Sequence, residues 1–178
     1  MPPLLRPIYR YCPMCGGVLE ARLLKPSQPE RLVCLVCGYI VYLDPKVVVG
    51  TIIKMEDDRI VLVRRAIEPG YGKWAFPGGY VDRGEEMTAA ARREALEETS
   101  LDVRLIGLIS IYSYTNRVPV VVVYAATAVG GTLRHCDESL EIGSFSQEQI
   151  PWENLAFRST RDALHDYFNG RLHCHGFE

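Results

Sequence analysis

Three glutamates fall within five residues of the segment RREALEETS, residues 92–100. Each residue of an α-helix advances by about 100°, so Glu94, Glu97 and Glu98 would project within a sector of about 100°. Like charges this close repel by a few tenths of a kcal/mol, and a purely structural face more often alternates its charges. Clustered carboxylate oxygens are ligands that Mg²⁺ prefers. Periodicity alone leaves two interpretations open, a solvated acidic face and a divalent-metal site.

The segment before this helix favours the metal site. It reads PGGYVDRGE, and its glycines allow a loop to approach a ligand closely. Arg93 lies eight residues after Glu85 and four before Glu97, so it is able to pair with carboxylates on both sides.

A second set of residues suited to metal binding is formed by cysteines. Two C-x2-C pairs are separated by eighteen residues, which is the spacing of a tetrahedral zinc site; the alternatives are two disulfides or two free dithiols. Four thiolates leave no position open for water, so the zinc would be structural. A glycine after each pair is expected to let the turn close with its N–H groups toward the sulfurs. The residues are Cys12, Cys15, Cys34 and Cys37, with Gly16 and Gly38.

The remaining sequence predicts the elements that position these residues. Residues 1–44 are expected to form a small module that depends on its metal, and residues 45–178 an α/β domain. Helices are predicted at 85–100, with Glu85 and Glu86 in the first turn, and at 158–170, with Gly170 as its stop. Strands are predicted at 46–55, 59–67, 103–114 and 117–129 and in the segment beginning at 141, with a loop at 68–84. The order β-β-loop-α-β-β-β-α predicts a mixed sheet with helices packed on it.

Composition limits the function classes. The 178 residues carry a net charge of −2, which argues against a broad nucleic-acid surface. The N-terminus has no apolar core typical of a secretory signal, and the apolar run 118–129 is too short to span a bilayer. We therefore expect a cytoplasmic protein without a membrane partner. The segment HCHG, 173–176, is expected to be a frayed tail rather than a metal site.

Residues 79–101, GYVDRGEEMTAAARREALEETSL, resemble the Nudix box, G-x5-E-x7-R-E-U-x-E-E-x-G-U, where U is bulky and aliphatic. The matching residues are Gly79, Glu85, Arg93, Glu94, Glu97, Glu98 and Leu101. Ala95 is a small residue at a U position, and Ser100 replaces the last glycine. The cysteine module ahead of the box and ESLEIGSFSQEQIPWENLAF behind it make the chain similar to zinc-ribbon Nudix hydrolases. The resemblance implies an α/β/α sandwich with a mixed sheet, preceded by a zinc ribbon.

The resemblance also implies an activity and roles for individual residues. Nudix hydrolases cleave the diphosphate bond of nucleoside diphosphates linked to another group, here with release of AMP. Glu94, Glu97 and Glu98 would bind Mg²⁺ or Mn²⁺, Arg93 would hold Glu85, and Gly79 would belong to the loop at the metal. A further glutamate would complete the site or act as base, and Glu141 is the first candidate by position, followed by Glu138. Many relatives are homodimers, so a homodimer is expected.

The substrate is less closely defined. The SQPWPFP signature of NADH pyrophosphatases is absent, which favours ADP-ribose or FAD over NADH. Phe76 and Tyr112 are candidates for stacking on an adenine or flavin, although aromatic residues in strands more often belong to the core. Arg65 is a candidate phosphate contact, and the alternative is an exposed strand end.

Three rival functions remain open at this stage. They are a pyrophosphohydrolase that clears nucleoside triphosphates, a non-catalytic ADP-ribose sensor and a zinc-ribbon adaptor for nucleic acid. The sensor is disfavoured because such domains usually lose box glutamates. Ser100 is expected to end the helix in the left-handed conformation, at a cost of roughly 1 kcal/mol relative to glycine.

Overall fold

A computed structural model describes residues 9–173, so the rest of the segment HCHG lies outside the described residues. The chain divides into two compact units, 1–45 and 46–178. The first contains an antiparallel sheet of three short strands, in the order β1-β2-β3, beside its cysteines. These strands are β1 (Leu19–Arg22), β2 (Arg31–Cys34) and β3 (Ile40–Val41).

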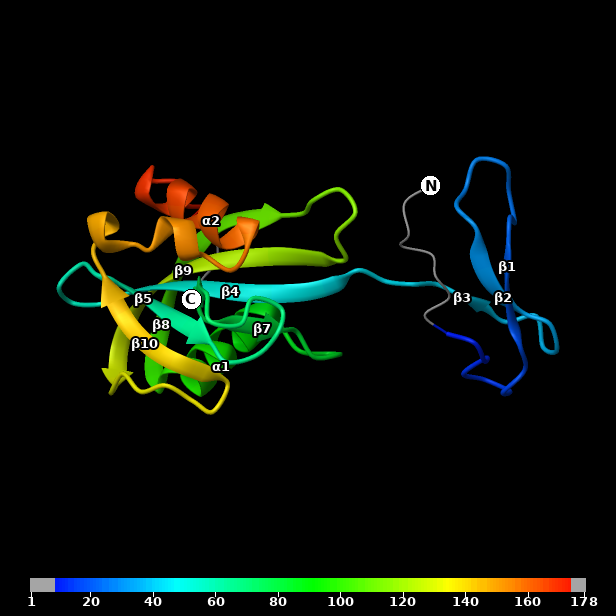
Figure 1. The fold of residues 1–178 in the computed structure, drawn as a ribbon, viewed down its shortest axis with the longest axis horizontal. Helices are drawn as coiled ribbons and strands as arrows, with labels where there is room; N and C mark the ends of the chain where they lie inside the picture. The colour runs from blue at the N-terminus through cyan, green and yellow to red at the C-terminus, as the bar shows by residue number, and fades with distance from the viewer. Residues whose placement is uncertain (1–8, 174–178) are drawn as a thin grey trace. The chain divides into compact units, whose positions relative to one another are not determined.

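The second unit is built on a seven-stranded mixed sheet (Figure 1). Its main order is β10-β5-β4-β9-β8; β4 and β9 pair in parallel, and the other pairs are antiparallel. Two short strands extend it, with β6 on β5 and β7 on β4. The bounds are β4 (Lys46–Lys54), β5 (Ile60–Arg65), β6 (Trp74–Ala75), β7 (Gly78–Tyr80), β8 (Leu101–Tyr112), β9 (Pro119–Gly131) and β10 (Ser139–Phe145).

The two helices α1 (Met87–Thr99) and α2 (Arg158–Phe168) cover opposite faces of this sheet (Figure 1). Consecutive residues of β9 face different helices. Val123 packs in the core cluster that contains Leu164 of α2, whereas Val122 packs in the cluster that contains Ala91 of α1. This alternation follows from the two-residue period of a strand. The predicted α/β/α sandwich with a mixed sheet is therefore confirmed, and two short 3₁₀ turns, η2 (Gln147–Gln149) and η3 (Trp152–Asn154), lead into α2.

Several local details differ from the sequence prediction. The segment 68–84 is not wholly a loop, because it contains β6 and β7. Helix α1 begins at Met87, so Glu85 and Glu86 precede it instead of lying in its first turn. Its end agrees with expectation, since Ser100 is left-handed with φ 59° and its N–H donates to the Leu96 carbonyl. Helix α2 ends at Phe168, and Gly170, with φ +77°, follows its cap residue Asn169.

Candidate functional site

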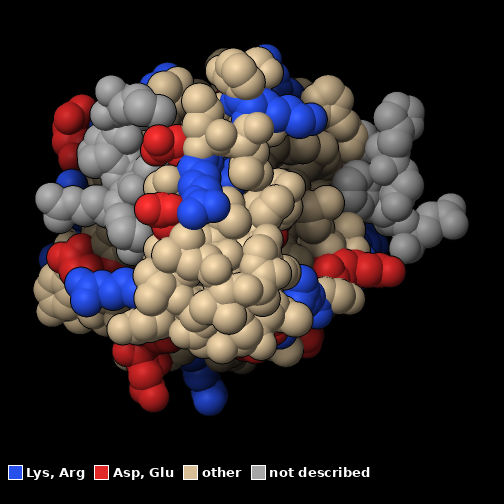
Figure 2. All heavy atoms as spheres, turned by 90° about the vertical axis from the view of Figure 1, so that its right-hand side faces the viewer, with Lys and Arg blue, Asp and Glu red and all other residues tan. Residues whose placement is uncertain are grey.

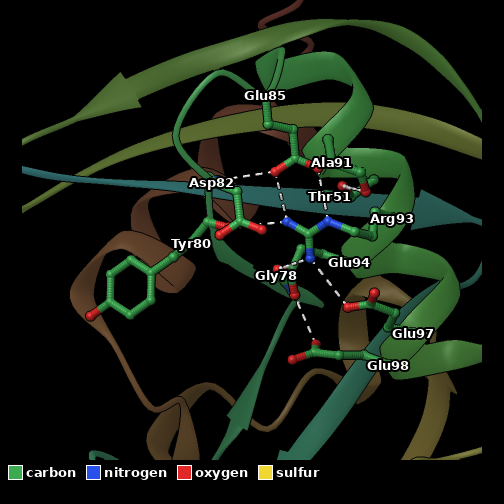
Figure 3. Close-up of polar contacts among 10 residues, drawn as sticks. All are labelled: Thr51, Gly78, Tyr80, Asp82, Glu85, Ala91, Arg93, Glu94, Glu97 and Glu98. Carbon is green, nitrogen blue, oxygen red and sulfur yellow. Dashed lines mark hydrogen bonds and ion pairs between the residues drawn. The ribbon is translucent and has the colours of Figure 1, made fainter.

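The centre of the site is Arg93, which holds three carboxylates in place (Figure 3). Its Nε and Nη2 donate to the two oxygens of Glu85 over 2.8 and 2.9 Å. Its Nη1 donates to Glu94 over 2.7 Å and to Glu97 over 3.2 Å. The bonds from Arg93, followed by the Asp82 N–H, lower the pKa of Glu85 to about 2. The structure thus places Arg93 between the loop carboxylate and two carboxylates of α1.

The glycine loop closes against the same helix. The Gly78 N–H donates to Glu98 Oε2 over 3.0 Å, so the loop orients this carboxylate through its backbone (Figure 3). A Cβ added at Gly79 would lie 2.5 Å from Glu94 Cδ and Oε2. Glycine at position 79 thus leaves room for the Glu94 carboxylate, which a larger side chain would displace. From the other side, Thr51 Oγ1 of β4 donates to the Ala91 carbonyl and ties α1 to the sheet.

The three helix glutamates lie in different surroundings. The Glu94 side chain is 13% exposed and that of Glu97 58%. Burial raises the pKa of Glu94 although Arg93 opposes the change. Burial also raises the pKa of Glu98 to about 7, against the effect of the Gly78 N–H. Since an anionic Glu98 is costly in this position, a cation beside it would stabilise the charged form.

The donor set fits a hard divalent cation. Three carboxylates, Glu85, Glu94 and Glu97, share one guanidinium, and Glu98 adds a fourth carboxylate, so negative charge is in excess. The glutamates do not form a tight cluster, since among residues 9–173 only the four cysteines bring three or more ligand atoms within 4.8 Å of one another. Glu97 is the most exposed of the three helix glutamates, and a turn toward an ion between Glu94 and Glu98 would break its 3.2 Å contact with Arg93. Oxygen ligands of this kind suit Mg²⁺ or Mn²⁺.

The two candidates for the further carboxylate lie in distinct places. Glu141 on β10 pairs with Arg64 over 3.4 Å, and its side chain is 56% exposed. Glu138 precedes β10, and its negative charge is one cause of the raised pKa of Glu98. A register shift in the pairing of β10 with β5 lies between Ser139 and Glu141. The charge of Glu138 thus acts on Glu98, whereas Glu141 pairs with Arg64, and the role predicted for Glu141 stays a prediction.

The predicted substrate contacts separate into one half-buried arginine and two core residues. Arg65 ends β5, its Nε donates to the Pro69 carbonyl over 2.9 Å, and its charge lowers the pKa of Glu98. Phe76 is 7% exposed and Tyr112 8%, and both pack in the main core cluster. The Tyr112 hydroxyl donates to Asp166 over 2.8 Å. Both aromatic residues therefore belong to the core, which was the alternative interpretation of aromatic residues in strands.

Sequence reasoning missed two groups that position the carboxylates, the Gly78 N–H and the Thr51 hydroxyl. The Gly78 N–H is a backbone group, so the only trace of it in the sequence is the pair of glycines at 78 and 79. Thr51 stands out only as a polar residue within the apolar segment KVVVGTIIK, and it is fully buried.

The four cysteines form a second, separate site. The Sγ atoms of Cys12 and Cys37 are 3.7 Å apart, and those of Cys15 and Cys34 are 3.5 Å apart. A tetrahedral zinc with bonds of about 2.3 Å separates its sulfurs by about 3.8 Å, so the set fits zinc. N–H groups of Cys37 and Val36 donate to Cys34 Sγ and lower its pKa to about 6, although burial opposes this. The glycines after the pairs have φ near +73°, as the predicted turns require.

The surface drawn in Figure 2 mixes acidic and basic side chains around a broad uncharged area. No continuous basic stripe crosses the described part of that face (Figure 2). Within residues 9–173, no helix is long and apolar enough to cross a membrane.

Comparison with known proteins finds a family model for each of the two units. Residues 44–167 match the family model described as NUDIX domain, and residues 10–43 match the model described as Nudix N-terminal. An ADP-ribose pyrophosphatase of Methanocaldococcus jannaschii is 36% identical over 123 residues, which are 67% of this chain and 71% of that protein. A MutT-like protein of Streptomyces ambofaciens is 30% identical over 103 residues, 58% of this chain and 64% of the relative. This chain therefore spans less than two thirds of the Streptomyces protein.

A crystal structure of a NUDIX hydrolase from Nitrosomonas europaea covers nearly the whole chain. Its TM-score is 0.85 at 32% identity, and the match includes 94% of this chain and 97% of that one. The similarity therefore extends beyond the box to the surrounding fold.

Proposed function

The chain belongs to the Nudix hydrolase family, and from that premise we propose that it hydrolyses the diphosphate bond of ADP-ribose, releasing AMP and ribose 5-phosphate. FAD is proposed as a second substrate and NADH as a weaker one. The observation that carries the proposal is the complete set of box carboxylates around Arg93, together with 36% identity to an enzyme named ADP-ribose pyrophosphatase.

The residues of the site supply positioning and charge. Arg93 fixes Glu85 of the loop against α1, so the loop and the helix move as one support. The Gly78 N–H aims Glu98, and Gly79 leaves room for Glu94. A divalent cation held by Glu94, Glu97 and Glu98 would neutralise the diphosphate oxygens and make water more acidic. Glu138 is proposed as the further carboxylate that holds a proton of the attacking water.

A resident zinc ion held by the four cysteines is proposed to be structural. Cysteine sulfurs fill all four positions, so this ion would have no site for substrate or water. It would stabilise a unit whose own buried core is small.

The test is a substrate panel with product identification. The purified protein would be incubated with Mg²⁺ or Mn²⁺ and ADP-ribose, FAD, NADH, NAD, diadenosine polyphosphates or dNTPs. We expect AMP from ADP-ribose and FAD. Monophosphate and pyrophosphate from dNTPs alone would replace this proposal with the pool-cleaning activity, and absence of any product would favour a non-catalytic sensor.

A further inference from the structure

A hollow opens in the surface where the chain enters α2. Its volume is about 240 Å³, and its walls are Leu155, Ala156, Phe157, Arg158 and Arg161. Pockets for drug-sized ligands start at roughly 300 Å³, so this hollow suits a single ring system better than a whole dinucleotide. An aromatic ring beside two guanidinium groups is suited to a flat, polar heterocycle.

The hollow and the carboxylate site share one support, the short segment from β6 to β7. Leu155 bridges Trp74 of β6, and the Ala156 N–H donates to the Trp74 carbonyl over 2.8 Å. Four residues further along, the Gly78 N–H donates to Glu98. Four residues span at most about 14 Å even when fully extended. Trp74, which contacts the hollow, and Gly78, which contacts Glu98, therefore lie no further apart than a nucleotide can reach.

Arg65 lies between the two places. Its guanidinium carbon is 5.1 Å from the centre of the Phe157 ring. A Cβ added at Gly70 would lie 3.1 Å from Ala156 Cβ and 3.6 Å from both Arg65 Cδ and Phe157 Cζ, so the loop packs against all three residues. The backbone N–H of Arg65 donates to the carbonyl of Lys73, the residue before β6, over 2.9 Å, and the charge of Arg65 lowers the pKa of Glu98.

The outer nitrogens of Arg65 are available to a ligand. Its Nε donates to the Pro69 carbonyl, whereas Nη1 and Nη2 contact no acceptor among residues 9–173. Arg158, in contrast, is paired with Asp162 over 3.3 Å and lies over the Tyr114 ring. Planar guanidinium groups with free N–H donors bind phosphate in a bidentate manner.

We propose that this hollow is the nucleobase subsite, with the adenine ring against Phe157 and the adjoining phosphate on Arg65. The inference rests on the proposed function, because it assigns a place to the nucleoside half of the same substrate. The diphosphate then extends from Arg65 toward Glu98. Specificity for a nucleoside diphosphate comes from the start of α2 in this arrangement, not from the core aromatics.

The test compares two product-like ligands, AMP and ribose 5-phosphate, which share a phosphate but not a base. Their Kd values would be measured calorimetrically with Mg²⁺ present, since neither has a diphosphate bond to be hydrolysed. For Phe157→Ala we expect the Kd of AMP to rise by about tenfold or more, as for loss of a stacked aromatic, and that of ribose 5-phosphate by less than about twofold. Phe157→Leu, which keeps the apolar volume, is expected to show the same selectivity. Arg65→Gln is expected to weaken both ligands.

Ile111→Ala is the matched control. Ile111 is 58% exposed on β8, at the opposite edge of the sheet order from β10 and β5. Three results would overturn the subsite. The folded Phe157 variants weaken the binding of AMP and ribose 5-phosphate equally, they leave the affinity for AMP unchanged, or the wild type does not bind AMP. Hydrolysis is scored separately. If ADP-ribose is not cleaved but the Phe157 variants selectively lose AMP binding, the proposed function fails and the subsite stands. If ADP-ribose is cleaved but the Phe157 variants show no selective loss of AMP binding, the subsite alone is rejected.

Discussion

Gly79 lies so close to Glu94 that alanine at this position is expected to displace a metal-binding carboxylate without unfolding the protein. The added Cβ would be 2.5 Å from Glu94 Cδ, and ordinary contact begins at 3.4 Å, so the carboxylate must move by roughly 1 Å. Glu94 is held by Arg93 over 2.7 Å and is largely buried, so the movement disturbs that ion pair. The backbone itself accepts alanine, because Gly79 is not among the glycines with positive φ.

The expected loss of turnover follows from this displacement. A misplacement of about 1 Å in a catalytic group lowers turnover by about 100-fold, which corresponds to about 2.7 kcal/mol of transition-state stabilisation. Stability is expected to change by less than about 1 kcal/mol, because the reduced entropy of the unfolded chain favours alanine. The assay combines kcat for ADP-ribose with the thermal unfolding midpoint and the Kd for Mn²⁺, which is expected to rise by about tenfold or more.

Gly130→Ala is the matched control for this variant. Its Cβ would lie 3.2 Å from a carboxylate oxygen of Asp102, but the position is exposed on β9 and distant in sequence from the box. We expect wild-type kcat and Mn²⁺ affinity from this control. Wild-type turnover of Gly79→Ala, or a loss of activity that only accompanies unfolding, would refute the packing argument.

Four further outcomes are expected. Glu98→Gln should reduce kcat by at least about 100-fold while keeping the fold, and near wild-type kcat would contradict its role. Glu138→Gln should lower kcat by at least about 100-fold, and Glu141→Gln by less than about threefold; the opposite ranking would restore the order predicted from the sequence. Ser100→Gly should leave kcat unchanged and stabilise the protein by up to about 1 kcal/mol, measured by urea unfolding, and a large loss of activity would show another role for Ser100. Chelation of zinc, or Cys37→Ser, should abolish the NMR dispersion of residues 9–45 only, and a spectrum that is unchanged would contradict a structural metal.

Much of the fold was predictable because its long elements carry clear periodicity. The glutamate helix and the apolar strands follow directly from residue type and spacing, and the expected left-handed Ser100 is found at the end of α1. The strands β6 and β7 were not predictable in the same way. They contain two and three residues and exist because β5 and β4 offer edges for pairing, which is a tertiary effect.

The site was predictable to the level of the box residues and no further. Fixed offsets identify Arg93 and its carboxylate partners, since helix geometry relates spacing to contact. Neither Glu138 nor Glu141 belongs to the box, and the register shift between Ser139 and Glu141 cannot be read from residue types. Phe76 and Tyr112 illustrate the same limit, because sheets with both faces covered bury aromatic residues that resemble stacking candidates.

The most direct test of the account is product analysis with ADP-ribose and Mg²⁺, using wild type and Glu98→Gln side by side. The wild type is expected to release AMP and ribose 5-phosphate in equal amounts, and the variant to release at least about 100-fold less in the same time. If the wild type releases no AMP under conditions where the protein is folded and binds Mg²⁺, the proposed activity is wrong.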